Sequence, residues 1–383
     1  MLIEIKGVQF VNKGASLMLR AVVDRLRAVV PGVEFALTPG PNAPFQRVAG
    51  MGAWQRLRLP GAPFDADAAC YRLPRRVRDV ARRYGIVMEP DVSAVLDASG
   101  FAYGTAWGDA ALDSTAEELQ RLAKHGKPYV FLPQAFGPFA DAPATRRFGH
   151  ALPRAALICA REPESRDHLA RLAGQPLPNL EVFPDFTLTA PGQSEAAARW
   201  GVDRSTALLI PNEHMRGPLN PDPAWRGGYI ALVAALAARL AERGFSVRVL
   251  NHEGRTDAAA CAELRAATGS PPVIDEEDPL ALKGVIGAAG LTVCSRYHGC
   301  VSSMSQGVPC LGTAWSHKYQ ALFDEFGQPG HVLSRCDPAA GAAALDQLLS
   351  GLDAARAQLA ERRPALEARV AAMWTRVLAI LSR

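Results

Sequence analysis

Residues 291–313 read LTVCSRYHGCVSSMSQGVPCLGT, and this stretch decides the fold. The segment 291–295 is short, apolar and β-branched, which predicts a buried strand. The small-residue run 300–306 has room for about two helical turns before a glycine, and 308–313 predicts the next strand. Because a strand, a helix and a second strand follow one another directly, the pattern is typical of a parallel α/β sheet.

Arg296 and His298 lie where the first of these strands ends and the helix begins. In an open parallel sheet, ligands bind at this carboxyl edge, and the helix start adds N–H groups and a partial positive charge. Together they suit a phosphate or a carboxylate. Lys318, in the run Ser316-His317-Lys318 after the second strand, adds another cation. The alternative interpretation is a solvated arginine and a hydrogen-bonded structural histidine.

The motif SRYHG at 295–299, followed by SQGVP at 305–309, resembles the polysaccharide pyruvyl transferase family. That family carries Ser/Ala-Arg-Leu/Met-His-Ala, then a helix, then Gly-Val-Pro. This chain departs from the pattern at Tyr297, in place of Leu or Met, and at Gly299, in place of Ala. Both departures keep the cation and the imidazole, and they bear on the acceptor pocket. The resemblance runs along most of the chain, from about Met1 to Gly330.

Length and composition predict a globular protein of two domains. The chain has 383 residues, of which 49% are hydrophobic and 21% charged. A net charge of +4 gives weak support for anionic ligands and none for nucleic-acid binding. Seven scattered cysteines without a Cys-x-x-Cys pair indicate reduced core residues and a cytoplasmic location. Neither a signal peptide nor a transmembrane helix is expected, so stable membrane insertion is not predicted either.

The N-terminal residues predict a β–turn–α–β unit. A strand at 2–8 is followed by the turn Asn12-Lys13-Gly14, a helix at 15–30 and a strand at 33–37. Asn12 and Lys13 therefore lie at the ligand-facing edge and are candidate substrate-binding residues. The alternative is that Gly14 opens the helix for steric reasons alone. The family has a similar Gly-Asn-x-Gly turn, whose first glycine is missing here.

Two further candidates follow later strands of the first half. A strand at 129–132 leads into PQAFGPF, which is similar to the Pro-Gln-Gly-x-Gly-Pro of the family. Gln134 could bind a sugar hydroxyl or serve its own loop. A strand at 156–160 leads to Arg161, where the family has Arg-Asp-x-x-Ser. For Asp185 we expect a turn or a cap.

A second α/β run supplies the remaining candidates. A strand at 207–210 precedes Asn212 and His214, and a strand at 246–250 precedes His252. Each of these residues leaves the carboxyl edge of a strand. The family has a histidine and an aspartate, here Asp257, at comparable places.

Three segments lack candidate site residues. Residues 38–63 are rich in Pro and Gly and predict a long loop or insertion. Residues 73–84 are rich in arginine and predict a solvated helix face, with contact to an anionic acceptor or a membrane surface as the weaker alternatives. The chain after residue 330 is Ala-rich and predicts helices, interrupted near Pro364, that could pack back on the first domain.

The expected fold class is α/β, with two Rossmann-like domains facing across a cleft (GT-B-like) and a C-terminal helical tail. The N-terminal domain at 1–190 is assigned to the acceptor. The C-terminal domain at 205–335 is assigned to phosphoenolpyruvate, and 336–383 form the tail. Two domains of this kind place every candidate residue on the carboxyl edge of a strand.

The resemblance implies a transferase of exopolysaccharide biosynthesis that moves a pyruvyl group from phosphoenolpyruvate to a sugar of a polysaccharide or glycan precursor, usually as a ketal. Arg296, Lys318 and, less directly, Arg161 would hold the carboxylate and phosphate of the donor. His298 would protonate the enol methylene. The general base stays open among His214, Glu213 and His252. No cofactor and no metal ion is expected.

Two other functions remain open at this point. One is a glycosyltransferase of the same fold that uses a nucleotide sugar, in which Glu325 could hold the ribose. The other is a non-catalytic sugar-binding protein. The oligomeric state is not indicated by any pattern in the chain.

Overall fold

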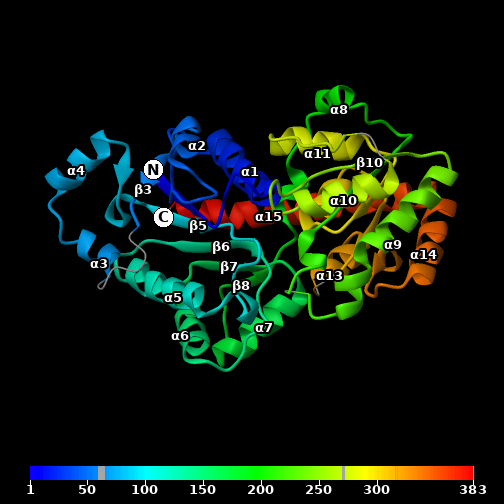
Figure 1. Cartoon of the computed structure of the whole chain (residues 1–383). Coiled ribbons are helices and arrows are strands. Elements are labelled where there is room, and N and C mark those ends of the chain that lie inside the picture. The colour runs from blue at the N-terminus through cyan, green and yellow to red at the C-terminus, as the bar shows by residue number, and fades with distance from the viewer. Residues whose placement is uncertain (59–64, 219, 270–271, 315, 317, 383) are drawn as a thin grey trace. The chain divides into compact units, whose positions relative to one another are not determined.

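The computed structural model describes residues 1–58, 65–218, 220–269, 272–314, 316 and 318–382, so His317, which precedes the candidate Lys318, lies outside the described residues. The chain divides into two compact units (Figure 1). The first comprises Met1–Phe10, Met18–Asp185 and Val370–Arg383, and the second comprises Val11–Leu17 and Phe186–Arg369. None of the described helices is both long enough and apolar enough to span a lipid bilayer.

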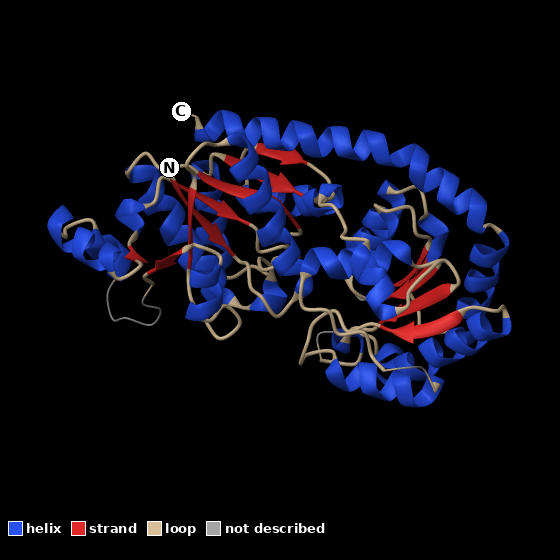
Figure 2. Cartoon of the chain, turned by 90° about the horizontal axis from the view of Figure 1, so that it is seen from above, coloured by secondary structure: helices blue, strands red, loops and turns tan. Residues whose placement is uncertain are grey.

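The first unit is a parallel sheet with helices packed against it (Figures 1 and 2). The strand order is β4-β3-β2-β1-β5-β6-β7-β8. Strands β2 to β4 are added on one side of β1 and strands β5 to β8 on the other, so the sheet has a switch point between β1 and β5. The strands are β1 (Leu2–Lys6), β2 (Glu34–Leu37), β3 (Trp54–Arg56), β4 (Ile86–Val87), β5 (Ala94–Asp97), β6 (Tyr129–Gln134), β7 (Leu157–Ala160) and β8 (Leu180–Val182). The helices are α1 (Lys13–Val29), α2 (Phe45–Gly50), α3 (Ala66–Cys70), α4 (Arg75–Arg83), α5 (Asp109–Lys124), α6 (Pro143–Ala151) and α7 (Pro163–Ala173).

The second unit is also a parallel sheet, with the order β10-β9-β11-β12-β13. Its strands are β9 (Thr206–Ile210), β10 (Ser246–Val249), β11 (Leu291–Cys294), β12 (Cys310–Thr313) and β13 (Val332–Leu333). Its helices are α8 (Glu195–Trp200), α9 (Pro223–Glu242), α10 (Ala258–Thr268), α11 (Pro279–Ala288), α12 (Tyr297–Met304), α13 (Lys318–Glu325), α14 (Pro338–Ser350) and most of α15 (Leu352–Leu381).

The segment 291–313 folds as its sequence predicts, into β11, α12 and β12. Both strands are fully buried, and their apolar residues pack in the core of the second unit. Cys294, Cys300 and Cys310, one from each element, are buried as free thiols. Parallel strands covered by helices on both faces require such continuously apolar sequences, which is why the pattern was decisive.

Four other expectations can be compared with the structure. The predicted loop at 38–63 is partly wrong, because it contains α2 and β3. The arginine-rich segment forms α4, in which no residue is buried, so the predicted solvated helix is confirmed.

The predicted interruption near Pro364 is wrong: α15 is continuous through this residue (Figure 2). Proline removes one helical hydrogen bond, but Leu359, Leu366, Val370 and Met373 are buried along the helix and outweigh that loss. The expectation that the tail packs back on the first domain holds only for its end: Val370–Arg383 belongs to the first unit, whereas residues 336–369 belong to the second. There, Arg376 pairs with Glu181 at 2.8 Å.

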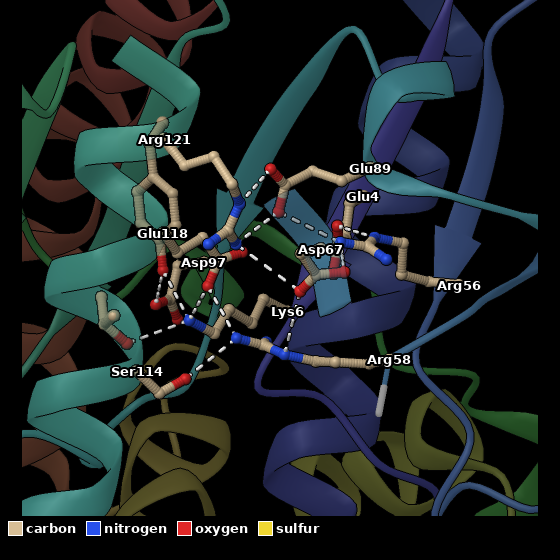
Figure 3. A network of polar contacts seen from close by, with 12 residues as sticks. Glu4, Lys6, Arg56, Arg58, Asp67, Glu89, Asp97, Ser114, Glu118 and Arg121 are labelled. Atoms are coloured by element: carbon tan, nitrogen blue, oxygen red, sulfur yellow. Dashed lines mark hydrogen bonds and ion pairs between the residues drawn. The ribbon is translucent and has the colours of Figure 1, made fainter. Parts of the chain in front are cut away.

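A network of buried charges lies beside the sheet of the first unit (Figure 3). Arg56, which is 1% exposed, contacts Glu4 at 2.9 Å, Asp67 at 2.9 Å and Glu89 at 3.2 Å. Arg121, which lies on α5, contacts Glu89 at 2.6 Å. Since a buried carboxylate without a cation is strongly unfavourable, each arginine here is needed by its acidic neighbours.

We therefore predict that Arg56→Ala lowers the free energy of unfolding by about 3–5 kcal/mol, because it leaves buried carboxylates uncompensated. The measurement is the denaturant midpoint of the transition that reports on the first unit. Arg75→Ala is the matched control, since that side chain is 87% exposed and its loss should change stability by less than about 0.5 kcal/mol. Equal midpoints for the two variants would contradict the prediction.

Candidate active site

The candidate site lies at the switch point of the sheet in the second unit. From β9 the chain passes to β10 on one side, while β11 pairs with β9 on the other side. In sheets of this order, ligands bind outside the carboxyl ends of the two strands that flank the switch. Asn212 follows β9 and Arg296 follows β11, so both predicted residues are placed there.

Asn212 joins the ends of β9 and β11. Its Nδ2 donates a hydrogen bond to the carbonyl of Ser295 at 3.0 Å, and its Oδ1 accepts one from the backbone N–H of His214 at 2.9 Å. The same carbonyl of Ser295 accepts a hydrogen bond from the hydroxyl of Tyr319 at 2.7 Å. The side chain of Asn212 is 2% exposed, so its contacts in the structure are to the loops that carry the site.

Arg296 is bound by two carboxylates. Its Nε donates to Asp257 Oδ2 at 2.8 Å, Nη2 contacts the other oxygen of Asp257, and Nη1 pairs with Glu253. Arg296 is 6% exposed and Asp257 is fully buried. A guanidinium carries five N–H groups, so these contacts do not use all of its donors. The loop after β10 is thereby tied to the loop after β11.

Burial has opposite effects on the two partners of this pair. It raises the pKa of Asp257 and lowers the pKa of Arg296, because in each case the charged form is desolvated. The two-pronged contact opposes both shifts, since each charge favours the charged form of the other. Burial raises the pKa of Asp257 to about 7, and the contact with Arg296 favours the ionised form of the pair.

Two histidines of the site are neutral at neutral pH. Burial, followed by the charges of Arg296 and Lys318, lowers the pKa of His214 to about 4. Burial, followed by the charges of Arg296, His298 and Lys13, holds the pKa of His252 well below its ordinary value. His252 is 4% exposed, and among the described residues no hydrogen-bond partner is found for its Nδ1.

The start of α1 packs against His252 and His298. The backbone N–H of Lys13 donates to the carbonyl of His252 at 3.3 Å, and Asn12 caps the helix by accepting from the N–H of Ala15 at 3.1 Å. A Cβ built on Gly14 would lie 2.3 Å from Nδ1 of His298. The glycine is therefore required by the position of His298, the half-buried second residue of α12.

Lys318 is the first residue of α13 and is 7% exposed. Its charge acts on His214, as the lowered pKa of that histidine indicates. Lys318 belongs to the second unit, as do most of the other predicted site residues: Arg296, His298, His214, His252, Asn212, Asn12 and Lys13.

The two remaining predicted residues belong to the first unit. Arg161 is 4% exposed and its Nη1 contacts Asp185 at 3.1 Å, so Asp185 is an ion-pair partner, and its role in a turn or cap stays a prediction. Gln134 is fully buried at the end of β6, and its Nε2 lies 3.5 Å from the carbonyl of Asp97. A substrate contact for either side chain stays a prediction.

Several residues of the site carried no clear signal in the sequence. Glu253 follows His252 directly, and only its position after a strand could have indicated a partner for Arg296. Tyr229 and Tyr319 lie on helices and reach Ser295 from two sides: the hydroxyl of Tyr229 is 2.6 Å from Ser295 Oγ. In the described part of the chain, no group of three or more His, Cys, Asp or Glu side chains is arranged to hold a metal ion.

The contact between Gly14 and His298 yields a prediction. Gly14→Ala should displace the imidazole ring, and thus shift the NMR resonance of the Cε1 proton of His298. It should also lower the melting temperature, although alanine normally stabilises a helix by about 1 kcal/mol relative to glycine. Gly227→Ala, on an exposed face of α9 with nothing within 4 Å of the added Cβ, is the control that should leave the resonance unchanged. An unshifted resonance in Gly14→Ala would show that the ring does not depend on this glycine.

Solved structures share this fold. The UDP-GlcNAc 2-epimerase of Neisseria meningitidis bound to UDP-GlcNAc matches with a TM-score of 0.60 and 12% identity, covering 99% of both chains. The UDP-N-acetylglucosamine 2-epimerase of Rickettsia bellii matches with a TM-score of 0.55 and 12% identity, covering 100% of this chain and 96% of that one. A UDP-glucose:anthocyanidin 3-O-glucosyltransferase in complex with UDP matches with a TM-score of 0.54 and 12% identity, covering 100% and 98%.

These likenesses concern the fold alone. They confirm the predicted class, an α/β protein of the GT-B kind with two Rossmann-like domains and a helical C-terminal tail. Among curated proteins, no sequence matches the chain. The family model of polysaccharide pyruvyl transferases matches residues 12–317, which include the candidate site except Lys318 and Tyr319. The chain belongs to the polysaccharide pyruvyl transferase family.

Proposed function

We propose that this transferase takes its pyruvyl group from phosphoenolpyruvate and attaches it as a ketal to a sugar of a polysaccharide or glycan precursor, as in exopolysaccharide biosynthesis. The observation that carries the proposal is the meeting of Arg296, Lys318 and His298 with two neutral imidazoles at the β9/β11 switch point. A donor with a carboxylate and a phosphate matches this mixture of cations and proton carriers.

The donor is strongly anionic, because its phosphate carries about −1.5 to −2 charges near neutral pH in addition to the carboxylate. Lys318 and Lys13, each 7% exposed, supply cations that are already largely desolvated. Arg296 is held by Asp257 and Glu253, so it can present its other N–H groups with little loss of rotational freedom. We assign the donor to this second unit.

The reaction needs one acid and one base. His298 donates a proton to the methylene carbon of the enol phosphate, which makes the adjacent carbon electrophilic. A sugar hydroxyl then attacks that carbon. The C–O bond to phosphate breaks, and a second hydroxyl completes the ketal. One hydroxyl proton replaces the proton given to the methylene, and the other leaves with inorganic phosphate, so protons and charges balance.

The geometry favours a histidine as the base. Glu213, the third candidate, accepts two contacts from Arg216 at 2.8 and 3.1 Å, and this cation favours the carboxylate in a structural ion pair. His214 and His252 are neutral and can accept a proton. Their lowered pKa values make them weak bases in the empty site, but the negative donor would raise both values toward the working range.

The acceptor is assigned to the first unit, where Gln134 ends β6. Arg161, which follows β7 in the same unit, stays a less direct candidate for the donor. We place the enzyme in the cytoplasm, because all seven cysteines are free thiols and six of them are buried. A nucleotide-sugar transferase has no comparable support: Glu325, its suggested ribose ligand, pairs with Arg369 at 2.7 Å.

The deciding experiment is calorimetric titration of the full chain with phosphoenolpyruvate and, separately, with UDP-sugars. Incubation with labelled phosphoenolpyruvate and a panel of glycans follows. The proposal expects saturable binding of phosphoenolpyruvate, transfer of label to a glycan and release of inorganic phosphate. Binding of a UDP-sugar alone would favour the glycosyltransferase, and binding without turnover of any acceptor would favour the sugar-binding protein.

For His298→Gln we predict that donor affinity is retained while the chemical step slows by about 10²–10⁴-fold, the usual contribution of a general acid. Phosphate release and donor titration on the same purified variant measure the two quantities. The wild-type rate should also fall at alkaline pH, and this limb should be absent from the variant. A normal rate per folded molecule, with only a lower melting temperature, would make His298 a structural residue.

His214 gives a prediction on pH. Its pKa of about 4 should rise when the negative donor binds beside Arg296 and Lys318. At a pH between the lower pKa of His214 in the empty site and its higher pKa in the complex, His214 takes up a proton when the donor binds. Donor affinity therefore increases as the pH falls through this range. Calorimetry at about pH 5.5, in buffers of different ionisation enthalpy, measures this uptake.

His214→Gln is the matched control for this experiment. The donor's own ionisation is the same for both proteins, so the difference between them isolates the histidine. We expect the variant to take up fewer protons on binding. Equal uptake by the two proteins would show that His214 does not sense the donor.

A further inference from the structure

Lys318 occupies a position that is unfavourable for a lysine. It is the first residue of α13, where the helix dipole places a partial positive charge, and it is 7% exposed. Its charge also acts on His214 together with that of Arg296. Something in the surrounding structure must therefore offset the cost of holding an ammonium group at this place.

Two tyrosine rings flank the ammonium group. Nζ of Lys318 lies 5.6 Å from the ring centroid of Tyr297 and 5.8 Å from that of Tyr319. Both distances are within the range in which an aromatic face attracts a cation. The rings meet edge to face, with centroids 5.9 Å apart and planes at 75°. The hydroxyl of Tyr319 is anchored on the carbonyl of Ser295 at 2.7 Å, so this pair of rings is fixed to the β11 loop.

Tyr297 lies between the two groups that act on the donor. It is the first residue of α12, between Arg296 and His298 in the chain, and it is 7% exposed. Its ring also meets the His298 ring edge to face, with centroids 5.5 Å apart and planes at 80°. The family motif has Leu or Met at this position. An aliphatic side chain fills space but has no negative ring face to attract a cation.

We propose that Tyr297 is a positioning residue that holds the ammonium group of Lys318 in the donor site through its ring face. The donor part of this inference rests on the proposed function, whereas the placement of Lys318 does not. Since the ring acts on a cation and transfers no proton, its loss should weaken donor binding more than it slows the chemical step.

The first test reads Lys318 directly and needs no donor. The full chain and its Tyr297→Leu variant are acetylated with trace acetic anhydride, and the peptides are quantified by mass spectrometry. Reactivity of Lys318 is expressed relative to Lys124, which is exposed on α5. We expect Tyr297→Leu to change this ratio by roughly 3- to 30-fold, and Tyr297→Phe, which keeps the ring, to restore most of the wild-type value.

The second test measures donor affinity and turnover. Tyr297→Leu should raise the Kd for phosphoenolpyruvate by roughly 3- to 30-fold, with kcat changed by less than about threefold. In a Lys318→Gln background the same substitution should add almost nothing, because the two residues act as a unit. Tyr297→Phe should recover most of the affinity. If Tyr297→Leu does not fold by circular dichroism, Tyr297→Met repeats both tests.

The outcomes separate the inference from the proposed function. An unchanged Lys318 ratio in Tyr297→Leu overturns the inference, whatever the donor is. A changed ratio with additive losses of affinity in the double variant overturns the donor part of it. A wild-type chain that does not bind phosphoenolpyruvate overturns the proposed function, while the acetylation ratio still decides whether Tyr297 holds Lys318.

Discussion

The ion pair between Arg296 and Asp257 is the interaction on which the candidate site depends. It joins the loop after β10 to the loop after β11, with Nε of Arg296 donating to Asp257 at 2.8 Å. Asn212, which follows the intervening strand β9, is hydrogen-bonded to Ser295 after β11, so three neighbouring strand ends are fixed relative to one another. A fully buried aspartate without its arginine would be strongly unfavourable, which makes the arrangement a condition of folding as well as of chemistry.

Much of this fold could be predicted from sequence because parallel strands are apolar throughout. The segments 207–210 and 291–295 are short apolar runs followed at once by polar residues, and that pattern places Asn212 and Arg296 at a sheet edge without any coordinates. The turn at Asn12 was found for the same reason. The structure places both candidates of the second half and the turn in one unit.

What sequence could not supply were partners distant in the chain. Nothing local indicates that Arg296 is paired with Asp257 and Glu253, or that Tyr319 comes beside Tyr297, because these contacts depend on how helices pack over the sheet. Burial could not be predicted either: the sequence places Gln134 after an apolar strand, whereas in the structure it is the fully buried last residue of β6. Pro364 shows that the burial of an apolar helix face can override a local propensity.

The buried thiols of the second unit have a consequence for kinetics. Cys294, Cys300 and Cys310 lie in β11, α12 and β12, and the thiol of Cys294 contacts the carbonyl of Arg296 at 3.2 Å. Cys336 in the same unit is partly exposed. A thiol reagent can reach the three inner sulfurs only when this part of the fold opens. Their labelling rate, compared with that of Cys336, would therefore measure how often the fold opens locally at the site. A ligand that slows this labelling would reveal that the site is occupied, without any assay of turnover.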